Sequence, residues 1–220
     1  MGEGSFSGRV AVVTGGTAAL GSAVAERFSG EGAEVVVVGS RDADLTDAAA
    51  ARRLAGEVRS SHGRCDALVC CAGGGFASGT FVHDEAAPDL WQRQFALNTT
   101  TAFNACHAFL PMMLERGEGA IVLVGSRAAV QPFAGAVPYA VSKAATIALA
   151  QALHAEVRME GLTVNAIIPS TIDTPTNRDA MPDADASRWV APDQIAALVL
   201  ALCGEAGRAT GGAIPVYGRA

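Results

Sequence analysis

The sequence lacks several features that would assign a chain to other classes of protein. It has no run of about 18 apolar residues, so it predicts no membrane span. It has no cluster of lysine or arginine, and its net charge of −6 argues against a nucleic-acid-binding surface. The N-terminus has neither the basic nor the apolar region of a secretory signal, and we expect residues 1–7 to form a loose leader.

The cysteines are few and odd in number, and no cysteine–histidine spacing repeats along the chain. We therefore expect no metal site and no disulfide. Most of the five cysteines lie in apolar runs, where a buried thiol in the reducing cytoplasm is the simplest explanation, so the chain is expected to be cytoplasmic. They are Cys65, Cys70, Cys71, Cys106 and Cys203.

What the sequence does contain is enough apolar material for one sizeable core. Half of its 220 residues are hydrophobic, and no polar linker divides them, so residues 1–220 predict a single domain. Short apolar runs alternate with helical segments, which predicts an α/β fold of Rossmann type. We expect a doubly wound parallel sheet of about six to seven strands with helices on both faces.

The boundaries follow from the hydrophobic pattern and from the turn residues. The predicted strands are Arg9–Thr14, Glu34–Gly39, Asp66–Cys71, Ala120–Gly125, Leu162–Ile168 and Ala213–Tyr217. The predicted helices run from the turn Thr14–Gly21 to about Gly30, from Asp47 to about Ser60, over Pro88–Arg116 and Ala136–Glu160, and onward from Pro192. The segment 169–191 is expected to be a long irregular loop.

Three polar residues predict acid–base chemistry at the end of one strand. Tyr139 and Lys143 are four residues apart, so they share one face of the predicted helix. A nearby cation favours phenolate over phenol, and we expect Lys143 to lower the pKa of Tyr139. Ser126 ends the apolar run before them and can hydrogen-bond the same reacting oxygen. By itself, this spacing is more typical of a surface pair on an amphipathic helix.

A glycine-rich turn predicts a phosphate site. Thr14–Gly21 connects a strand to a helix, whose first N–H groups and dipole favour an anion. A tight connection without a ligand explains the glycines equally well. Asp44, after the second strand, could accept a hydrogen bond from an adenine amine. The small residues Ala72, Gly73 and Gly74 would let a cofactor approach the next strand.

These motifs occur in one order along the chain: Thr14-Gly15 with Gly21, Asp44–Asp47, Cys71-Ala72-Gly73, Asn98, Ser126, Tyr139 with Lys143, and Pro169 with Thr174. Together they resemble the short-chain dehydrogenase/reductase family over nearly the whole chain. The segment Asp173–Trp189 is also similar to dihydropteridine reductase. The resemblance implies an NAD(P)-dependent oxidoreductase that interconverts a carbonyl and an alcohol.

The resemblance also implies a role for each site residue. Tyr139 would be the general acid and base, Lys143 would hold the ribose, and Ser126 would stabilise the alkoxide. Asn98 would hold a water molecule that relays protons, although a helix-bending amide is nearly as good a reading. Thr174 and the Ile172 backbone would fix the carboxamide, unless Thr174 only forms a turn before Pro175. The implied cofactor-binding residues are Gly15, Thr17, Ala19, Leu20, Gly21, Ser40, Arg41, Asp44, Leu45, Ala72, Gly73, Gly74, Tyr139, Lys143, Pro169, Ile172 and Thr174.

The end of the second strand bears on which cofactor binds. Gly39 stands where NAD-dependent members carry an aspartate, while Ser40 and Arg41 can hold a 2′-phosphate. This favours NADP(H). Asp42 could instead pair with Arg41 or hold a ribose, so NAD(H) stays an alternative.

The sequence departs from the family in ways that leave other functions open. Ala19 replaces a usual glycine, and the helix and strand that usually separate Gly39 from Asp44 are missing, so a catalytically silent NADP-binding scaffold or regulator is a second hypothesis. A pterin reductase is a third, although Ser126 favours ordinary carbonyl chemistry.

The remaining expectations concern the substrate and the assembly. Residues 170–191 are expected to cover a small-molecule substrate. Phe133, Met181 and Trp189 would line the site or belong to the core, and Arg127 would anchor a loop rather than bind a substrate anion. His107 and His154 are expected to be packing or surface residues. By the resemblance, a helix face of alanines would pair subunits into a homodimer or homotetramer; they are Ala140, Ala144, Ala148 and Ala152.

Overall fold

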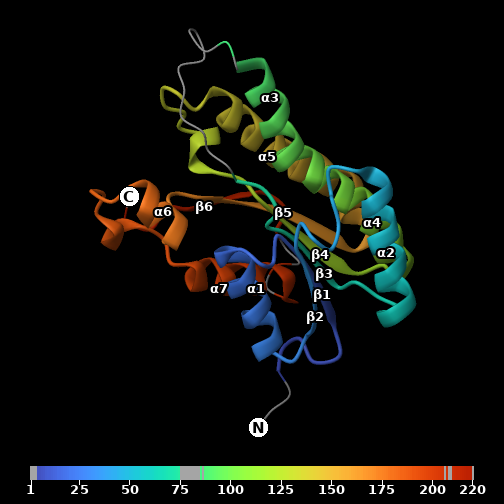
Figure 1. Cartoon of the computed structure of the whole chain (residues 1–220). Helices are drawn as coiled ribbons and strands as arrows, with labels where there is room; N and C mark the ends of the chain where they lie inside the picture. The colour runs from blue at the N-terminus through green and yellow to red at the C-terminus, as the bar shows by residue number, and fades with distance from the viewer. Residues whose placement is uncertain (1–3, 75–84, 86, 206, 208–209, 220) are drawn as a thin grey trace.

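Six parallel strands form one sheet in the computed structural model, which describes residues 4–74, 85, 87–205, 207 and 210–219. The strands lie in the order β2-β1-β3-β4-β5-β6 (Figure 1). Their bounds are β1 Val10–Thr14, β2 Glu34–Val38, β3 Ala67–Cys70, β4 Gly119–Val124, β5 Leu162–Pro169 and β6 Ala213–Val216. The predicted α/β class and the predicted parallel sheet are confirmed.

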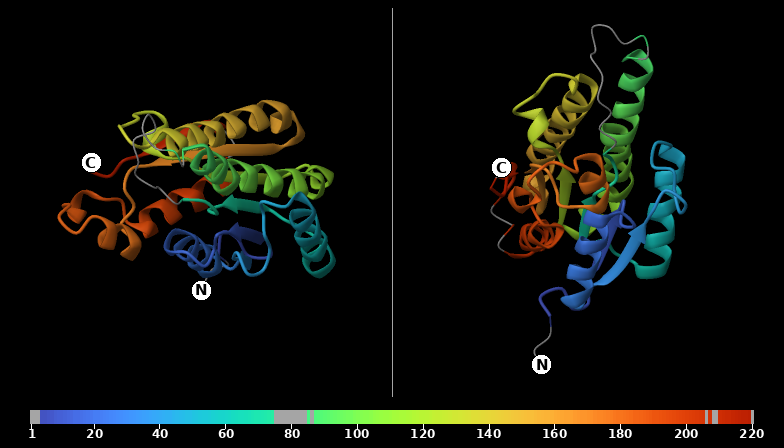
Figure 2. Two further views of the ribbon diagram at one scale, coloured as in Figure 1. Left: turned by 45° about the horizontal axis from the view of Figure 1, so that its top comes forward. Right: turned by 60° about the vertical axis from the view of Figure 1, so that its left-hand side comes forward.

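Helices cover both faces of this sheet (Figures 1 and 2). Their bounds are α1 Ala19–Gly30, α2 Ala48–His62, α3 Ala87–Phe95, α4 Thr101–Arg116, α5 Val137–Val157, α6 Pro175–Ala180 and α7 Pro192–Cys203. Successive strand residues point to opposite faces. Val12 therefore packs beneath the helices α2, α4 and α5, whereas Val13 packs beneath α1 and α7. Burial on both faces explains why the strands are continuous apolar runs.

The helix ends follow the capping residues of the sequence. The Asp47 carboxylate accepts hydrogen bonds from the backbone N–H groups of Ala49 and Ala50, and it begins α2 as predicted. Gly63 ends α2 with a φ of 70°, which a residue with a side chain rarely adopts. No side chain caps the N-terminus of α1, so side chains leave its first N–H groups open to a ligand.

Two predicted elements differ from the structure. The predicted helix 88–116 is interrupted by a π-helical turn at Ala96–Thr100. The segment 169–191 is not wholly irregular, because it contains α6 and a 3-10 turn at Ala186–Arg188. The Thr174 hydroxyl caps α6 by accepting from the Asn177 N–H, and Arg178 forms a bidentate ion pair with Asp173. These short-range polar contacts stabilise α6, in a segment that the sequence predicted to be irregular.

The described part of the leader is packed rather than loose. Phe6 is 1% exposed and meets the Phe28 ring edge-on at 4.8 Å. The Ser5 hydroxyl and its N–H both donate to the Glu31 carboxylate. The expectation of a loose leader is therefore wrong for residues 4–7, and residues 1–3 lie outside the described part of the chain.

No strand lies between Gly39 and Asp44, as the short spacing between these residues predicted. The chain passes from β2 to α2 through residues 39–47 alone, and β2 forms an edge of the sheet. These residues lie at the carboxyl ends of the strands, where ligands bind in such sheets. No helix in the described residues is long and apolar enough to cross a membrane.

Candidate active site

Ser126 and Tyr139 are brought together at the carboxyl edge of the sheet. Ser126 follows β4 and begins a 3-10 turn at Arg127–Ala129, where its hydroxyl accepts from the Ala128 N–H at 3.2 Å. Tyr139 lies in the first turn of α5. Burial raises the pKa of Tyr139, and a hydrogen bond from the Ser126 side chain lowers it in part. The phenol is therefore held in its protonated form, next to the serine that the sequence paired with it.

Lys143 lies one turn further along α5 and is 4% exposed. Its ammonium donates to the backbone carbonyl of Val124 at 2.8 Å, and burial lowers the pKa of Lys143 to about 8. The expectation that Lys143 lowers the pKa of Tyr139 is wrong. Burial dominates that phenol, and the net shift of its pKa is upward.

A buried polar network surrounds Asn98. Its Nδ2 donates to Gln94 Oε1 at 2.9 Å and to Ser142 Oγ at 3.1 Å, and its Oδ1 accepts from the Gly74 N–H at 2.8 Å. The Ser142 hydroxyl donates in turn to the backbone carbonyl of Tyr139. The network thus connects the loop after β3 to the start of α5. Asn98 lies inside the π-helical turn, which agrees with the predicted helix distortion.

The turn after β1 has the shape of a phosphate cradle. Gly15 has a φ of 65°, and a Cβ there would lie 2.6 Å from the backbone nitrogen of Ala72. The turn leads into the uncapped N-terminus of α1, where backbone N–H groups favour an anion. Thr17 and Ala19 are exposed, Leu20 is half-buried, and Gly21 packs against Gly15. Within the described chain every positive φ belongs to glycine, so the backbone accepts Ala19 without strain.

The loop after β3 lies against Lys143. Gly73 has a φ of 134°, and a Cβ there would lie 2.7 Å from Asn98 Oδ1 and 3.4 Å from Lys143 Nζ. Only a residue without a side chain fits between these two groups. Ala72, Gly73 and Gly74 follow β3 as predicted, and Gly73 lies beside Lys143, a contact that the sequence did not predict. The glycine cradle and this loop together fit a dinucleotide.

The loop after β2 carries charges of both signs. Asp42 Oδ2 accepts from the Gly39 N–H at 2.8 Å, whereas the Ser40 and Arg41 side chains are exposed. Asp44 Oδ1 accepts from the N–H and the hydroxyl of Thr46, and these bonds lower the pKa of Asp44.

Beyond β5, the chain leaves the carboxyl edge of the sheet beside the end of β4. Pro169 is buried at the end of β5, and Ile172 pairs with Val190 in a parallel bridge. The Ile172 carbonyl accepts from the Asn177 side chain at 2.8 Å. Thr174 caps α6, so a short helix rather than a plain turn begins at Pro175, and the contact of Thr174 with a carboxamide stays a prediction.

The remaining predicted residues take these places. The Arg127 guanidinium lies 5.2 Å from the centre of the Tyr217 ring and donates through Nε to Gln131, which agrees with a loop anchor. Phe133 is 54% exposed and Met181 is 39% exposed, so neither is a core residue. His154 accepts from the Val164 N–H.

The described residues contain no group of three His, Cys, Asp or Glu side chains that could hold a metal ion. All five cysteines are free thiols.

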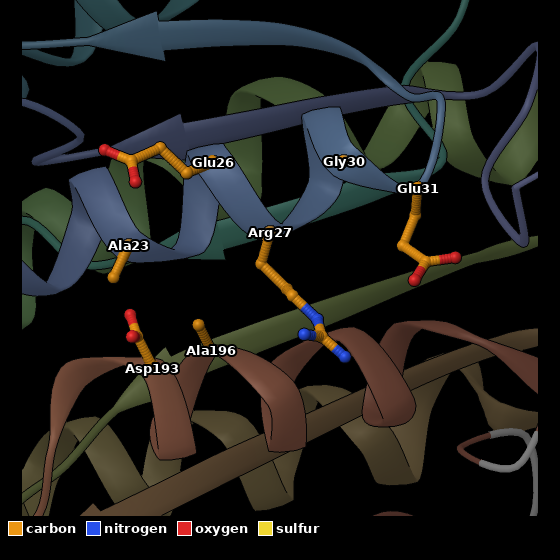
Figure 3. A pocket seen from close by; sticks show the side chains of 7 residues that line it. All are labelled: Ala23, Glu26, Arg27, Gly30, Glu31, Asp193 and Ala196. Atoms are coloured by element: carbon orange, nitrogen blue, oxygen red, sulfur yellow. The ribbon is translucent and has the colours of Figure 1, made fainter.

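A hollow of about 370 Å³ lies elsewhere, between α1 and α7 (Figure 3). Arg27 reaches into it from α1 and Asp193 from α7. Both helices cover the sheet face opposite to α5, which carries Tyr139 and Lys143. The hollow is therefore separate from the candidate active site.

Sequence reasoning missed Gln94, Asn104 and Ser142. Each is at most 7% exposed and makes a side-chain hydrogen bond that joins two elements. The signal that could have found them is a polar residue on the apolar face of a helix, because a buried polar group needs a partner.

Comparison with known proteins gives one consistent result. A family profile described as "short chain dehydrogenase" matches residues 9–185. D-threitol dehydrogenase of Mycolicibacterium smegmatis is 31% identical over 238 residues, covering 94% of this chain and 90% of that protein. The NAD(+)-dependent 2-dehydro-3-deoxy-L-rhamnonate dehydrogenase of a Sphingomonas species is 31% identical, covering 78% and 75%. A crystal structure of a putative short-chain dehydrogenase/reductase from Burkholderia xenovorans superposes with a TM-score of 0.87 at 31% identity, covering 98% and 97%.

Proposed function

Because the chain belongs to the short-chain dehydrogenase/reductase family, and is therefore an NAD(P)-dependent oxidoreductase, we propose that Tyr139, Ser126, Lys143 and Asn98 are its catalytic residues. The observation that carries this proposal is the hydrogen bond between the Ser126 and Tyr139 side chains, one helical turn from the buried Lys143. A surface pair on an amphipathic helix would show neither the bond nor the burial.

Tyr139 acts as the proton donor when a carbonyl is reduced. Its raised pKa keeps the phenol protonated at neutral pH, which is the form that can donate. Ser126 donates a hydrogen bond to the same substrate oxygen and stabilises the negative charge that develops there. The nicotinamide cofactor supplies or accepts the hydride.

Lys143 and Asn98 support this proton transfer. Lys143, one helical turn from Tyr139, would hold the ribose hydroxyls of the cofactor beside the phenol. Asn98 holds the loop of Gly73 and Gly74 against Lys143 through its Oδ1. A water molecule held by Asn98 would relay protons to Lys143.

The cofactor is NAD(P)(H), and within that pair we favour NADP(H). Arg41 and Ser40 are exposed at the end of β2, where a 2′-phosphate would lie, and an arginine can grip phosphate with two parallel donors. The competing group is Asp42, which would repel a phosphate and suit a ribose hydroxyl. Because one oxygen of Asp42 accepts from the Gly39 N–H, a loop-closing role accounts for this carboxylate. The Sphingomonas relative, named for NAD(+), is the counter-example that makes the cofactor test necessary.

The substrate is a small carbonyl compound or alcohol. The names of the relatives suggest where to begin, with four-carbon polyols and 2-dehydro-3-deoxy sugar acids. Residues 170–191 would cover the substrate. The homodimer or homotetramer and the cytoplasmic location stay proposals that rest on the sequence.

The test is a screen of purified protein with NADP(+) and NAD(+) against polyols and sugar acids, and with NADPH and NADH against simple ketones, quinones and pterins, followed at 340 nm. The proposal predicts turnover of at least one carbonyl or polyol class and none of the pterins. Turnover confined to pterins would instead establish a pterin reductase. Tight cofactor binding with no turnover in any class would indicate the silent dinucleotide-binding protein.

A further inference from the structure

Asn104 makes an unusual contact for a residue in the middle of a helix. It lies on α4, is 7% exposed, and its Nδ2 donates to the backbone carbonyl of Leu45 at 2.9 Å and to that of Thr46 at 3.2 Å. Leu45 and Thr46 are 59 and 58 residues away in the sequence. The Asn104 amide therefore donates both of its hydrogen bonds to the backbone of the loop between β2 and α2.

This loop has little else to hold its backbone on that side. A further strand beside β2 would give the loop a strand to pair with. Here β2 is an edge of the sheet, and the chain runs from β2 directly into α2. The other hydrogen bonds of Asp44 and Thr46 are local and join residues two or three positions apart. Asn104 is thus the long-range polar anchor that the described structure gives to these two carbonyls.

The position of the loop gives this anchor a consequence. Leu45 is 5% exposed and packs into the core, which leaves the Asp44 carboxylate outside at the carboxyl edge of the sheet. That edge is where the adenine half of a dinucleotide lies in doubly wound folds. A shift of the loop backbone would move Asp44 directly, since only one peptide bond separates it from Leu45.

We propose that Asn104 is a positioning residue of the cofactor site, which holds the loop Asp44–Thr46 in place of the missing strand so that it can receive the adenine. This inference rests on the proposed function, because it assumes that a dinucleotide binds. Asn104 touches neither cofactor nor substrate and acts through the loop. Its replacement should therefore weaken the adenine half of the site and leave the chemistry at Tyr139 unchanged.

The experiment compares wild type with Asn104→Leu, which keeps the size of the side chain and removes both donors. Binding of NADPH and of ADP-ribose is measured by calorimetry, and kcat is measured at saturating cofactor. One buried and one part-buried carbonyl of the loop lose their partner, so the loop shifts and both affinities should fall about tenfold or more. The value of kcat should stay within about twofold, a separation that general destabilisation would not produce. Met112→Ala, a cavity change in the buried face of the same helix, is the matched control and should leave ADP-ribose binding unchanged.

A second arm needs no ligand. Hydrogen–deuterium exchange of residues 44–50 should become faster in Asn104→Leu than in wild type and in Met112→Ala. Unchanged exchange in this loop, or unchanged ADP-ribose affinity in a folded variant, would overturn the inference. If wild type binds no dinucleotide, the proposed function fails, while the exchange arm still decides whether Asn104 anchors the loop.

Discussion

Arg41 and Asp42 are neighbours with opposite charge at the end of β2, and the choice of cofactor depends on which of them meets the ribose. If Arg41 binds a 2′-phosphate, Arg41→Ala should weaken NADPH roughly tenfold or more, because a charge-assisted hydrogen bond contributes about 1.5–3 kcal/mol. NADH should be nearly unaffected. The measurement is the ratio of the two dissociation constants in each variant.

Asp42→Asn is the matched control, since it keeps an acceptor for the Gly39 N–H and removes the negative charge. The same account predicts that it tightens NADPH slightly and leaves NADH unchanged. Tighter binding of NADH than NADPH by wild type, together with loss of NADH affinity in Asp42→Asn, would assign the ribose to Asp42 and the preference to NAD(H).

Lys143 is a residue whose burial in the site lowers the stability of the fold. Burial lowers its pKa from 10.5 to about 8, so the unfolded chain binds more protons between these two pH values. The cost of burying the ammonium is therefore fully present below pH 8 and disappears as the pH rises toward 10.5. At pH 7, Lys143→Met should have a free energy of unfolding about 1–2 kcal/mol higher than wild type, after the lost bond to the Val124 carbonyl is subtracted. The measurement is urea unfolding, in which the variant should unfold at a higher urea concentration.

The pH dependence distinguishes this explanation from better packing of methionine. The stability difference between Lys143→Met and wild type should shrink between pH 8 and pH 10. A difference that is constant over this range, or a variant less stable than wild type at pH 7, would show that burial of the charge is not the cause.

At the scale of elements, the contact between the π-helical turn and α5 is polar where helix contacts are usually apolar. Gln94 and Ser142 both accept from the Asn98 amide, and that amide holds the Gly74 N–H. Gln94→Leu removes one acceptor, so the Asn98 side chain can rotate away from Gly74. We expect the KM for the cofactor to rise about threefold to tenfold, a loss of about 1 kcal/mol in binding.

Thr99→Val is the control for this prediction. It deletes a bond of the same helix contact, from the Thr99 hydroxyl to the Ser142 carbonyl, without touching the Asn98 amide. It should lower the melting temperature as Gln94→Leu does and leave the KM for the cofactor unchanged. Equal effects of both variants on KM would assign the loss to the helix contact as a whole.

The elements also show what the sequence could predict. Every strand follows from an apolar run, and the start of α2 follows from its cap Asp47, because these signals are contained within a few residues. The pairing of Ser126 with Tyr139 was accessible through motif spacing. Asn104 was not, because its partners lie 59 and 58 residues away and a single polar residue in a helix gives no direction. Gln94 lies only four residues from its partner Asn98, but nothing in the sequence shows that this helix face is buried. The pKa of Tyr139 was predicted with the wrong sign, because burial depends on the whole fold.

At the scale of the molecule, α4 and α5 each expose apolar side chains, and those of α5 recur at helical spacing and form an apolar stripe. Val141 is 40% exposed, Val137 39% and Phe103 50%, and the predicted alanine face continues along α5 with Ala148 and Ala152 exposed. Ala140 is instead buried against Ala128 and Ala136. We expect this stripe to join two copies of the chain, as the resemblance implied.

Val141→Glu places a charge in this stripe and should convert a dimer or tetramer to a smaller species in light scattering. Met159→Glu is the control, because Met159 is 82% exposed and lies outside the stripe. A wild-type mass equal to one chain, or an assembly that Val141→Glu does not change, would contradict the expected interface.

The most direct test of the account is a deuterium-transfer measurement on wild type and Tyr139→Phe. With cofactor deuterated at C4 of the nicotinamide and an active carbonyl substrate from the screen, wild type should place deuterium on the carbonyl carbon of the product. Tyr139→Phe keeps the ring and removes the proton donor, so labelled product should form roughly two to four orders of magnitude more slowly, with cofactor affinity within about twofold. Labelled product formed by Tyr139→Phe at a rate within about threefold of wild type would show that Tyr139 is not the acid.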